Sequence, residues 1–241
     1  MIITSVNNEL VKETAKLLQR KYRKEEFLLE GSKCIEEAIE SGLEIKHIFV
    51  LNGSNEFSDF ANRIETTEAV LSKISSTESA PKAVAIAKKI KRDWSNKYKK
   101  VVLLEDIKDA GNLGTILRTA CAFNIDAIVL YGDTVDLYNP KCVRSSVGNL
   151  WKIPVFEMND LSLFKDYERI ATLPKADNTV WLKDYAPQDK VLVMFGTEAS
   201  GLSDKLKNFA TKNVTIEMSD KVESLNLSIS AGVIMYKLLE V

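Results

Sequence analysis

The sequence predicts an α/β protein whose C-terminal part is a mostly parallel sheet covered by helices on both faces. From about residue 101 onward, short apolar runs alternate with segments of helical periodicity, a pattern typical of β-α-β units. Runs such as VVLL and VLVMF are apolar at every position, as expected of strands buried on both faces. With 241 residues, of which 45% are hydrophobic and 28% charged, the chain is long enough for one large domain or two modest ones.

The N-terminal part of the chain is predicted to be a small α/β domain over residues 1–95. Its helices are indicated by apolar positions at helical spacing, and one of them stops at Gly42, because glycine commonly ends helices. Its strands are short apolar runs bounded by polar turns. The predicted elements are a helix over 8–24, a strand over 27–31, a helix over 32–42, a strand over 45–51, a loop leading into a helix over 52–64, and a strand or helix over 81–90.

A polar, basic and aromatic segment, KRDWSNKYKK (Lys91–Lys100), follows and is predicted to be a linker or a domain edge. Two interpretations of this segment are open. Its lysine and aromatic side chains suit phosphates and bases, so it can help to hold RNA. Alternatively, it is a solvated connection and contacts nothing.

The remainder, residues 96–241, is predicted to be the second domain and to contain the parallel sheet. Its strands are apolar runs, and its helices are amphipathic or, at the C-terminus, mostly apolar. The predicted strands cover 101–106, 126–132, 153–158, 169–174, 190–196 and 213–218, and the predicted helices cover 112–124, 141–148, 202–210 and 225–240.

Composition excludes several kinds of chemistry. The single histidine, His47, lies in an apolar strand and is most simply half-buried, so a His-rich metal site cannot be built and none is expected. The three cysteines are far apart and lack CxxC spacing, which is typical of reduced thiols in a cytoplasmic protein. No apolar stretch has the ~20 residues that a membrane helix needs. The chain starts without the apolar core of a signal peptide, so we expect a soluble, cytoplasmic protein.

Charge gives only a weak indication of a nucleic-acid partner. The formal net charge is −1, so the whole chain shows no basic excess. Residues 1–100 nevertheless hold 18 Lys and Arg against 15 Asp and Glu, whereas the rest of the chain holds 15 against 19. Any contact with a polyanion is therefore expected to begin in the N-terminal part.

Polar residues follow three of the predicted strands, where a parallel sheet binds its ligands. After the strand over 101–106, Asn112 lies at a helix start, and Arg118 lies further along that helix. Each residue also has a simple structural interpretation, because an arginine on a helix is usually solvated or ion-paired, and a polar residue before a helix is usually its cap. Gly196, Glu198 and Gly201 follow the strand over 190–196. Ser224, Asn226 and Ser228 follow the strand over 213–218, and Ser224 is the predicted N-cap of the last helix.

These segments together resemble a known family. The series NLGTILRTA, FGTEASGL and IEMSDKVESLNLS, in this order, resembles the three motifs of the SpoU (TrmH-like) family of RNA 2′-O-ribose methyltransferases in the SPOUT superfamily. The segment KCVRSSVGNLWKIPV is similar to the family's connecting segment, with Arg144, Ser146 and Gly148 at its usual positions. The first part of the chain resembles the RNA substrate-binding domain that is often fused to such enzymes.

The resemblance implies a fold, a cofactor and an assembly. The fold is the SPOUT fold, in which the last part of the chain passes through a loop to form a deep trefoil knot. The cofactor is S-adenosyl-L-methionine, bound bent in the knot, and no metal is needed. The protein is implied to be a homodimer whose active site is completed across the interface. The implied cofactor-binding residues are Thr172, Leu173, Gly196, Ile216, Met218 and Leu225.

The resemblance also implies which residues perform methyl transfer to a ribose 2′-hydroxyl. Arg118 engages the 2′-hydroxyl and the adjacent phosphate, and in the family this arginine is often described as the base. Because a guanidinium pKa exceeds ~12, we expect Arg118 instead to stabilise the developing alkoxide while a substrate phosphate or water takes the proton. The residues expected to orient Arg118 and the ribose are Asn112, Glu198, Ser224 and Asn226.

Three other functions are compatible with parts of this pattern. One is a catalytically silent RNA-binding protein of the same fold, another is a knotted methyltransferase that acts on a base nitrogen, and the third is a plain nucleotide-binding α/β protein. The Asn-x-Gly-x-x-x-Arg pattern favours ribose, and the absence of a phosphate-binding loop disfavours the third function. Among RNA substrates, the appended N-terminal domain favours ribosomal RNA over transfer RNA by family analogy.

Overall fold

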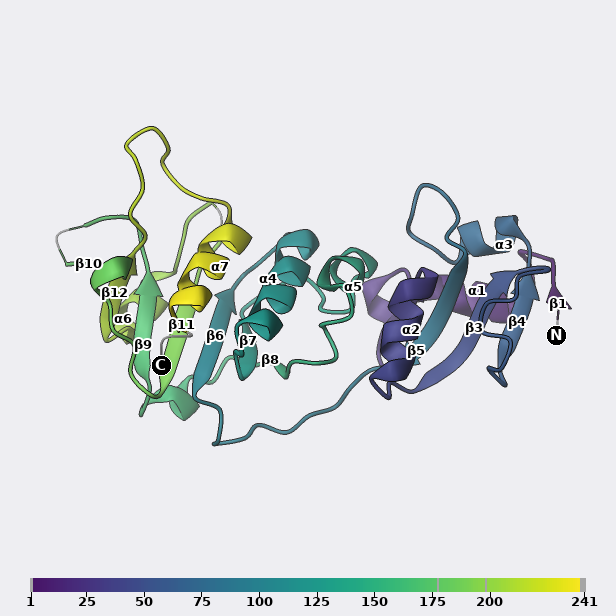
Figure 1. The fold of residues 1–241 in the computed structure, drawn as a ribbon, viewed down its shortest axis with the longest axis horizontal. Helices are drawn as coiled ribbons and strands as arrows, with labels where there is room; N and C mark the ends of the chain where they lie inside the picture. The colour runs from purple at the N-terminus through teal and green to yellow at the C-terminus, as the bar shows by residue number, and fades with distance from the viewer. Residues whose placement is uncertain (1, 177, 198, 239–241) are drawn as a thin grey trace. The chain divides into compact units, whose positions relative to one another are not determined.

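The computed structural model describes residues 2–176, 178–197 and 199–238, which form two compact units (Figure 1). The first unit consists of residues 1–91 together with the segment 136–151. The second consists of residues 92–135 and 152–241. The chain therefore leaves the second unit once and returns to it.

The first unit is built on a five-stranded mixed sheet in the order β1-β4-β3-β5-β2. In this sheet β5 is antiparallel to both of its neighbours, whereas β4 is parallel to β1 and β3. The strands are β1 (Ile2–Ile3), β2 (Glu26–Glu30), β3 (Ile45–Leu51), β4 (Arg63–Thr66) and β5 (Ala83–Lys88). The helices are α1 (Glu9–Lys16), the 3-10 turn η1 (Arg20–Tyr22), α2 (Ser32–Glu40) and α3 (Glu68–Lys73).

Two predictions for this unit were wrong. The helix predicted over 8–24 ends at Lys16, and the chain continues through turns into η1. Residues 52–64, predicted to be a loop that leads into a helix, lead instead into strand β4, because Ile64 and Thr66 are buried there against β3. The helix starts later, at Thr67, whose side chain accepts a hydrogen bond from the Val70 N–H.

The segment 136–151 is attached to strand β2 by an ion pair near each end of that strand. Near the start, the buried Arg23 donates through Nε to Asp136 Oδ2 at 2.6 Å. At its end, Arg144 on α5 (Pro140–Ser146) pairs with the buried carboxylate of Glu30, which also accepts a hydrogen bond from the Ser76 N–H at 2.6 Å. Gly148 in this segment has φ of 73°, a left-handed conformation in which other side chains are strained.

The second unit confirms the predicted parallel sheet. Its seven strands lie in the order β10-β12-β9-β11-β6-β7-β8, and every adjacent pair is parallel. The strands are β6 (Lys100–Glu105), β7 (Ala127–Tyr131), β8 (Val155–Glu157), β9 (Glu168–Thr172), β10 (Val180–Trp181), β11 (Val191–Phe195) and β12 (Lys212–Thr215). Only β10 was not predicted, because two half-buried residues leave no periodicity to detect.

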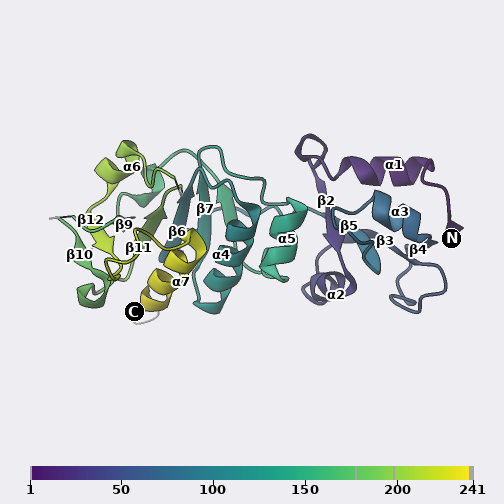
Figure 2. The ribbon, with the colours of Figure 1, turned by 90° about the horizontal axis from the view of Figure 1, so that it is seen from above.

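Helices cover both faces of this sheet (Figure 2). On one face, α4 (Ala110–Ala122) packs against α7 (Leu227–Lys237). On the other face, α6 (Asp204–Phe209) and the turn η2 (Ser162–Phe164) cover a core that includes Val101, Val129 and Met194. A third short turn is η3 (Leu182–Asp184).

The segment Lys91–Lys100 is irregular as far as Lys99, and Lys100 begins β6. Its two aromatic rings are turned inward. Trp94 and Tyr98 pack against the core of the second unit, and the Trp94 ring lies 5.2 Å from the Phe164 ring. These two rings are therefore not available to stack on bases.

The histidine is half-buried in a strand and the cysteines are free thiols, as the sequence analysis predicted. His47 is half-buried in β3, and burial lowers its pKa. Cys34, Cys121 and Cys142 are free thiols, and burial raises the pKa of each, to about 12 for Cys34. None of the helices in the described ranges is long and apolar enough to cross a membrane.

Candidate active site

Strand register brings the predicted cofactor-binding residues to one edge of the parallel sheet. Phe195 of β11 lies opposite Leu104 of β6, and Met194 lies opposite Ala171 of β9. Thr172 in turn lies opposite Val214 of β12. The strands β6, β9, β11 and β12 thus end at one level. The residues that lie at this edge or just beyond it are Glu105, Thr172, Leu173, Gly196, Thr215 and Ile216.

The backbone doubles back tightly after β11. Thr197 and Gly201 exchange two backbone hydrogen bonds, of 3.2 and 2.9 Å. A Cβ added to Gly196 would lie only 2.0 to 2.2 Å from the backbone atoms of Gly201 and Leu202, so only glycine fits there. Gly201 has φ of 66°, a left-handed conformation that glycine adopts without cost. Glu198, predicted as an orienting residue in this loop, lies outside the described residues.

A buried carboxylate that the sequence analysis missed supports this loop. Glu105, at the end of β6, is 4% exposed, and its Oε2 accepts a hydrogen bond of 2.7 Å from the Ser203 N–H. Ser203 is also the N-cap of α6. The only sequence signal for this role was an acidic residue at the end of an apolar strand, where charge is costly unless it is paired.

The loop between β6 and α4 is held by two aspartates. Asp106, with φ of 52°, accepts a hydrogen bond of 2.6 Å at Oδ1 from the Asp133 N–H. The same oxygen would lie 2.3 Å from a Cβ added to Gly132, so the two loops touch closely. Asp109 caps α4 by accepting a hydrogen bond from the Asn112 N–H at 2.8 Å.

The structure brings Asn112 and Asn226 together. Asn226 Nδ2 donates to Asn112 Oδ1 at 3.1 Å, although the two residues are far apart in the chain. This contact joins the N-terminal ends of α4 and α7, while the rings of Phe123 and Tyr236 touch near the other ends, with centroids 5.6 Å apart. The two helices therefore run parallel. Their N-terminal dipoles add positive potential at the same place, which favours an anion.

The predicted role of Ser224 as N-cap was wrong. Asn226 caps α7, because its Oδ1 accepts hydrogen bonds from the Ser228 N–H at 2.9 Å and the Ile229 N–H at 3.4 Å. Ser228 adds a third bond to the same oxygen through its hydroxyl, at 2.6 Å. Ser224 instead lies exposed in the loop between β12 and α7. Ile216, Met218 and Leu225 lie half-buried in this loop.

Arg118 is exposed on α4 and keeps its charge available. Within the described ranges, no residue forms an ion pair or hydrogen bond with its guanidinium group. Thr115, one turn earlier, is also exposed. The structure of the single chain thus places Arg118 on the same helix as Asn112 but does not pair it with Asn112 or Asn226.

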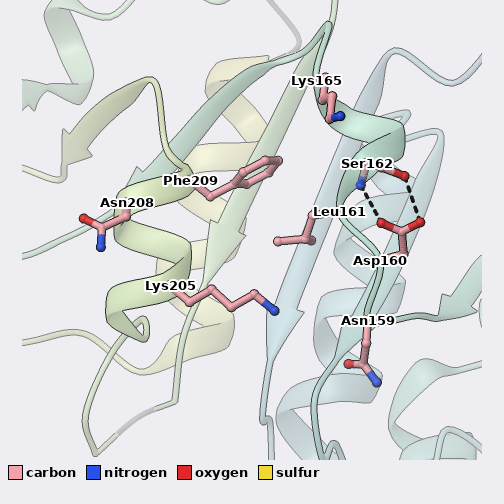
Figure 3. Close-up of a pocket in the computed structure, with 8 residues that line it drawn as sticks. All are labelled: Asn159, Asp160, Leu161, Ser162, Lys165, Lys205, Asn208 and Phe209. Carbon is pink, nitrogen blue, oxygen red and sulfur yellow. Dashed lines mark hydrogen bonds between the residues drawn. The ribbon is translucent and has the colours of Figure 1, made fainter.

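Two further observations concern metal-binding groups and a groove away from the motif residues. Among the described residues, no group of three His, Cys, Asp or Glu side chains is placed to hold a metal ion. A groove of about 490 Å³ lies between α6 and η2, on the other face from α4, and contains none of the predicted site residues (Figure 3). Its Asp160 carboxylate is occupied by the N–H and hydroxyl of Ser162, and these bonds lower the pKa of Asp160.

Comparison with known proteins agrees with this arrangement. The model of the SpoU rRNA Methylase family matches residues 99–236, which is more than half of the chain. The chain belongs to the SpoU rRNA methylase family. The model of the MRM3-like substrate binding domain matches residues 8–85 of this SpoU methylase. The resemblance noted in the sequence and the predicted α/β fold are both confirmed.

Relatives of this SpoU methylase match along nearly the whole chain. A 23S rRNA (guanosine(2553)-2′-O)-methyltransferase of Bacillus subtilis is 32% identical, over 98% of this chain and 98% of that protein. An uncharacterised tRNA/rRNA methyltransferase of Synechocystis is 34% identical, over 98% of this chain and 92% of that protein. The AdoMet-bound rRNA methyltransferase from Sinorhizobium meliloti has a TM-score of 0.86 and 26% identity, covering 98% of this chain and 96% of that one.

Proposed function

We propose that this SpoU methylase transfers the methyl group of S-adenosyl-L-methionine to a ribose 2′-hydroxyl in ribosomal RNA. The observation that carries the proposal is the convergence of three separate sequence motifs on one edge of a parallel sheet. Asn112, Gly196 and Asn226 come from the three motifs, and each lies at or just beyond a strand or helix end there. The full-length match to a 23S rRNA 2′-O-methyltransferase supports ribosomal rather than transfer RNA.

The residues at this edge fit the cofactor. Leu173, Ile216, Met218 and Leu225 supply half-buried apolar surface, and Gly196 allows backbone to approach a ligand closely. The Thr172 hydroxyl donates to the Met194 carbonyl at 2.9 Å, so its proton is already used within the sheet. When bound, the cofactor supplies an activated sulfonium methyl group, and the protein's task is to place an acceptor oxygen in line with it.

The remaining residues handle the acceptor. Arg118 binds the phosphate next to the target ribose and stabilises negative charge on the 2′-oxygen as its O–H bond breaks. The proton passes to water or to a substrate phosphate, since a guanidinium group is not a base at neutral pH. Asn112 and Asn226, already joined by a hydrogen bond, orient the ribose. Glu198 and Ser224 are proposed to help orient Arg118 and the ribose.

We propose that a homodimer completes the site, and an exposed apolar stripe on α7 supports this proposal. On α7, three apolar side chains lie exposed along one stripe at helical spacing: Ile229, Val233 and Tyr236, which are 54%, 40% and 62% exposed. They lie on the helix that packs beside the helix of Arg118. An exposed apolar stripe of this kind marks a protein interface. We propose a second copy of the chain as its partner.

The expected result of Val233→Asp is a monomer with an unchanged fold, because a buried, unpaired carboxylate is costly in an apolar interface. Molar mass measured by light scattering after size exclusion tests this, with circular dichroism as the check on folding. Leu163→Asp is the matched control, since Leu163 is 42% exposed on η2. If Val233→Asp has the same molar mass as the wild type, α7 is not the interface.

We assign RNA substrate binding to residues 1–95 and catalysis to residues 96–241, and we propose that the protein acts in the cytoplasm. We also propose the trefoil knot of the family, formed by the last part of the chain. The substrate-binding model and the family model, which match residues 8–85 and 99–236, support this division.

The first experiment incubates the pure protein with cofactor carrying a labelled methyl group and with total RNA from cells that lack the gene. We expect label in a large ribosomal RNA, recovered as a 2′-O-methyl nucleoside. Label on a base would support a base-nitrogen methyltransferase instead, and label only in small RNA would support a transfer-RNA substrate. Absence of both label and cofactor binding would support the catalytically silent RNA-binding protein.

A further inference from the structure

We propose that the exposed side of α1 and η1 binds the phosphate backbone of RNA. We call this surface the α1–η1 surface and define it by Lys12, Lys16, Lys21, Tyr22 and Lys24. It belongs to the first unit and includes none of the residues assigned to methyl transfer. The inference rests on the proposed function only in taking RNA as the partner.

The first argument is the local excess of positive charge. Residues 9–24, which cover α1 and η1, contain six basic side chains and two acidic ones, Glu9 and Glu13, of which Glu13 pairs with Lys16. Lys12, Lys21 and Lys24 are exposed, and no described residue forms an ion pair with any of them. Other lysines of the same unit are neutralised: Lys46 pairs with Glu26 at 2.9 Å, and Lys88 pairs with Glu44 at 2.6 Å. Unpaired, clustered cations attract phosphates.

The second argument is the arrangement of these cations around an aromatic ring. Tyr22 is 42% exposed, and its ring centroid lies 4.9 Å from Lys21 Nζ and 5.9 Å from Lys16 Nζ. Two ammonium groups repel each other, and the shared ring offsets part of that repulsion through cation–π attraction. Tyr22 therefore acts as a positioning residue that holds both lysines on the same side of the turn.

The third argument is that a buried ion pair fixes the turn. Arg23, between Tyr22 and Lys24, has a side chain only 3% exposed and bonded to Asp136. Its Nη1 also donates to the Leu17 carbonyl at 2.7 Å, which ties the end of α1 to η1. Because Arg23 points inward and is held at both contacts, the neighbouring side chains of Tyr22 and Lys24 face solvent. A surface ordered before binding loses less entropy when it binds.

RNA fits this surface better than an anionic membrane does. Membrane-binding surfaces combine cations with apolar side chains that insert among the lipids. Between residues 12 and 24 the only exposed large apolar side chain is Tyr22, and it is already engaged by two lysines. Phosphate contacts alone carry no sequence information, so the α1–η1 surface would add affinity and orientation while other contacts select the nucleotide.

The test measures RNA affinity over a series of salt concentrations, with full-length protein and a 23S rRNA transcript. For Lys21→Gln/Lys24→Gln, we expect the Kd for RNA to rise about tenfold at physiological salt. The slope of log Kd against log salt should fall by about 1.5, because each lost phosphate contact lowers that slope by about 0.7 to 0.9. The matched control is Lys46→Gln/Lys88→Gln, which removes the same charge from lysines that are already paired. It should bind as the wild type does. Tyr22→Leu should weaken binding, and Tyr22→Phe should restore it.

The outcomes separate this inference from the proposed function. If both double variants bind RNA with the wild-type affinity and slope, the α1–η1 surface does not bind RNA. If both lose affinity equally, only net charge matters and the inference is also wrong. If only the Lys21/Lys24 variant loses RNA affinity and the wild type transfers no methyl group, the α1–η1 surface binds RNA and the proposed methyltransferase activity is wrong. Binding of vesicles rich in anionic lipid, lost in the Lys21/Lys24 variant without any change in RNA affinity, would assign the surface to membranes instead.

Discussion

Arg118→Ala is expected to lower the rate of methyl transfer by at least about a hundredfold and to leave cofactor affinity unchanged. The loss follows because Arg118 is proposed to stabilise charge on the 2′-oxygen, and removing one such donor typically costs a factor of about 10² to 10³. The fold should not change, because the side chain is exposed and bonded to no described residue. Single-turnover methyl transfer and calorimetric titration with the cofactor measure the two quantities.

Arg118→Lys tests the geometry of that contact rather than its charge. A lysine keeps the positive charge but cannot make the two parallel hydrogen bonds of a guanidinium group, so we expect turnover well below the wild type. Near-normal turnover of Arg118→Lys would show that the two-bond contact is wrong. The matched control for Arg118→Ala is Lys99→Ala, which removes an exposed cation just before β6, at the opposite edge of the sheet, where Lys99 pairs with Asp189 at 2.7 Å.

Gly196→Ala is expected to abolish measurable cofactor binding and to destabilise the protein. The new Cβ would lie 2.0 Å from the backbone carbon of Gly201, so the loop after β11 must move away from the sheet edge. Overpacking in a well-packed region costs about 1–3 kcal/mol, which corresponds to a lower Tm by roughly 2–12 °C for a chain of this size. Calorimetric titration and thermal unfolding measure the two effects.

Gly232→Ala is the control for the same substitution elsewhere. Gly232 lies within α7, and a Cβ there would meet only Thr119 Cγ2 at an ordinary 3.6 Å. Alanine is favoured over glycine inside a helix, so this variant should be as stable as the wild type or more stable, and it should bind cofactor normally. If Gly196→Ala behaves like Gly232→Ala, the doubled-back loop does not form part of the cofactor site.

The sequence predicted the second unit well because the signals there are local. A strand buried on both faces needs an uninterrupted apolar run, and β6, β7 and β11 each have one. Helices between such strands force parallel pairing, so the sheet type follows as well. Once the strands are parallel, residues that follow them must lie at a shared edge, which is why the motif residues converge.

The errors arose where tertiary contacts overrode local pattern. The basic segment after α1 has helical spacing, yet the buried pairing of Arg23 with Asp136, a residue more than a hundred positions away, holds it in a turn. Ser224 and Asn226 are both good capping residues, and only the position of α7 beside α4 decides for Asn226, because Asn226 also reaches Asn112. For Trp94 and Tyr98, in a polar and basic stretch, the sequence left two interpretations open, and in the structure both rings pack against the core of the second unit.

By itself, the sequence determined the fold class, the ordered motifs and therefore the family, because apolar periodicity and motif spacing are properties of the chain alone. Only the tertiary structure decided which polar residues lie together. Asn112 meets Asn226, and Glu105 holds Ser203, through hydrogen bonds between residues 114 and 98 positions apart. It also decided which cations remain exposed and unpaired. Such pairings depend on how strands and helices are brought side by side in space, and no local pattern encodes that.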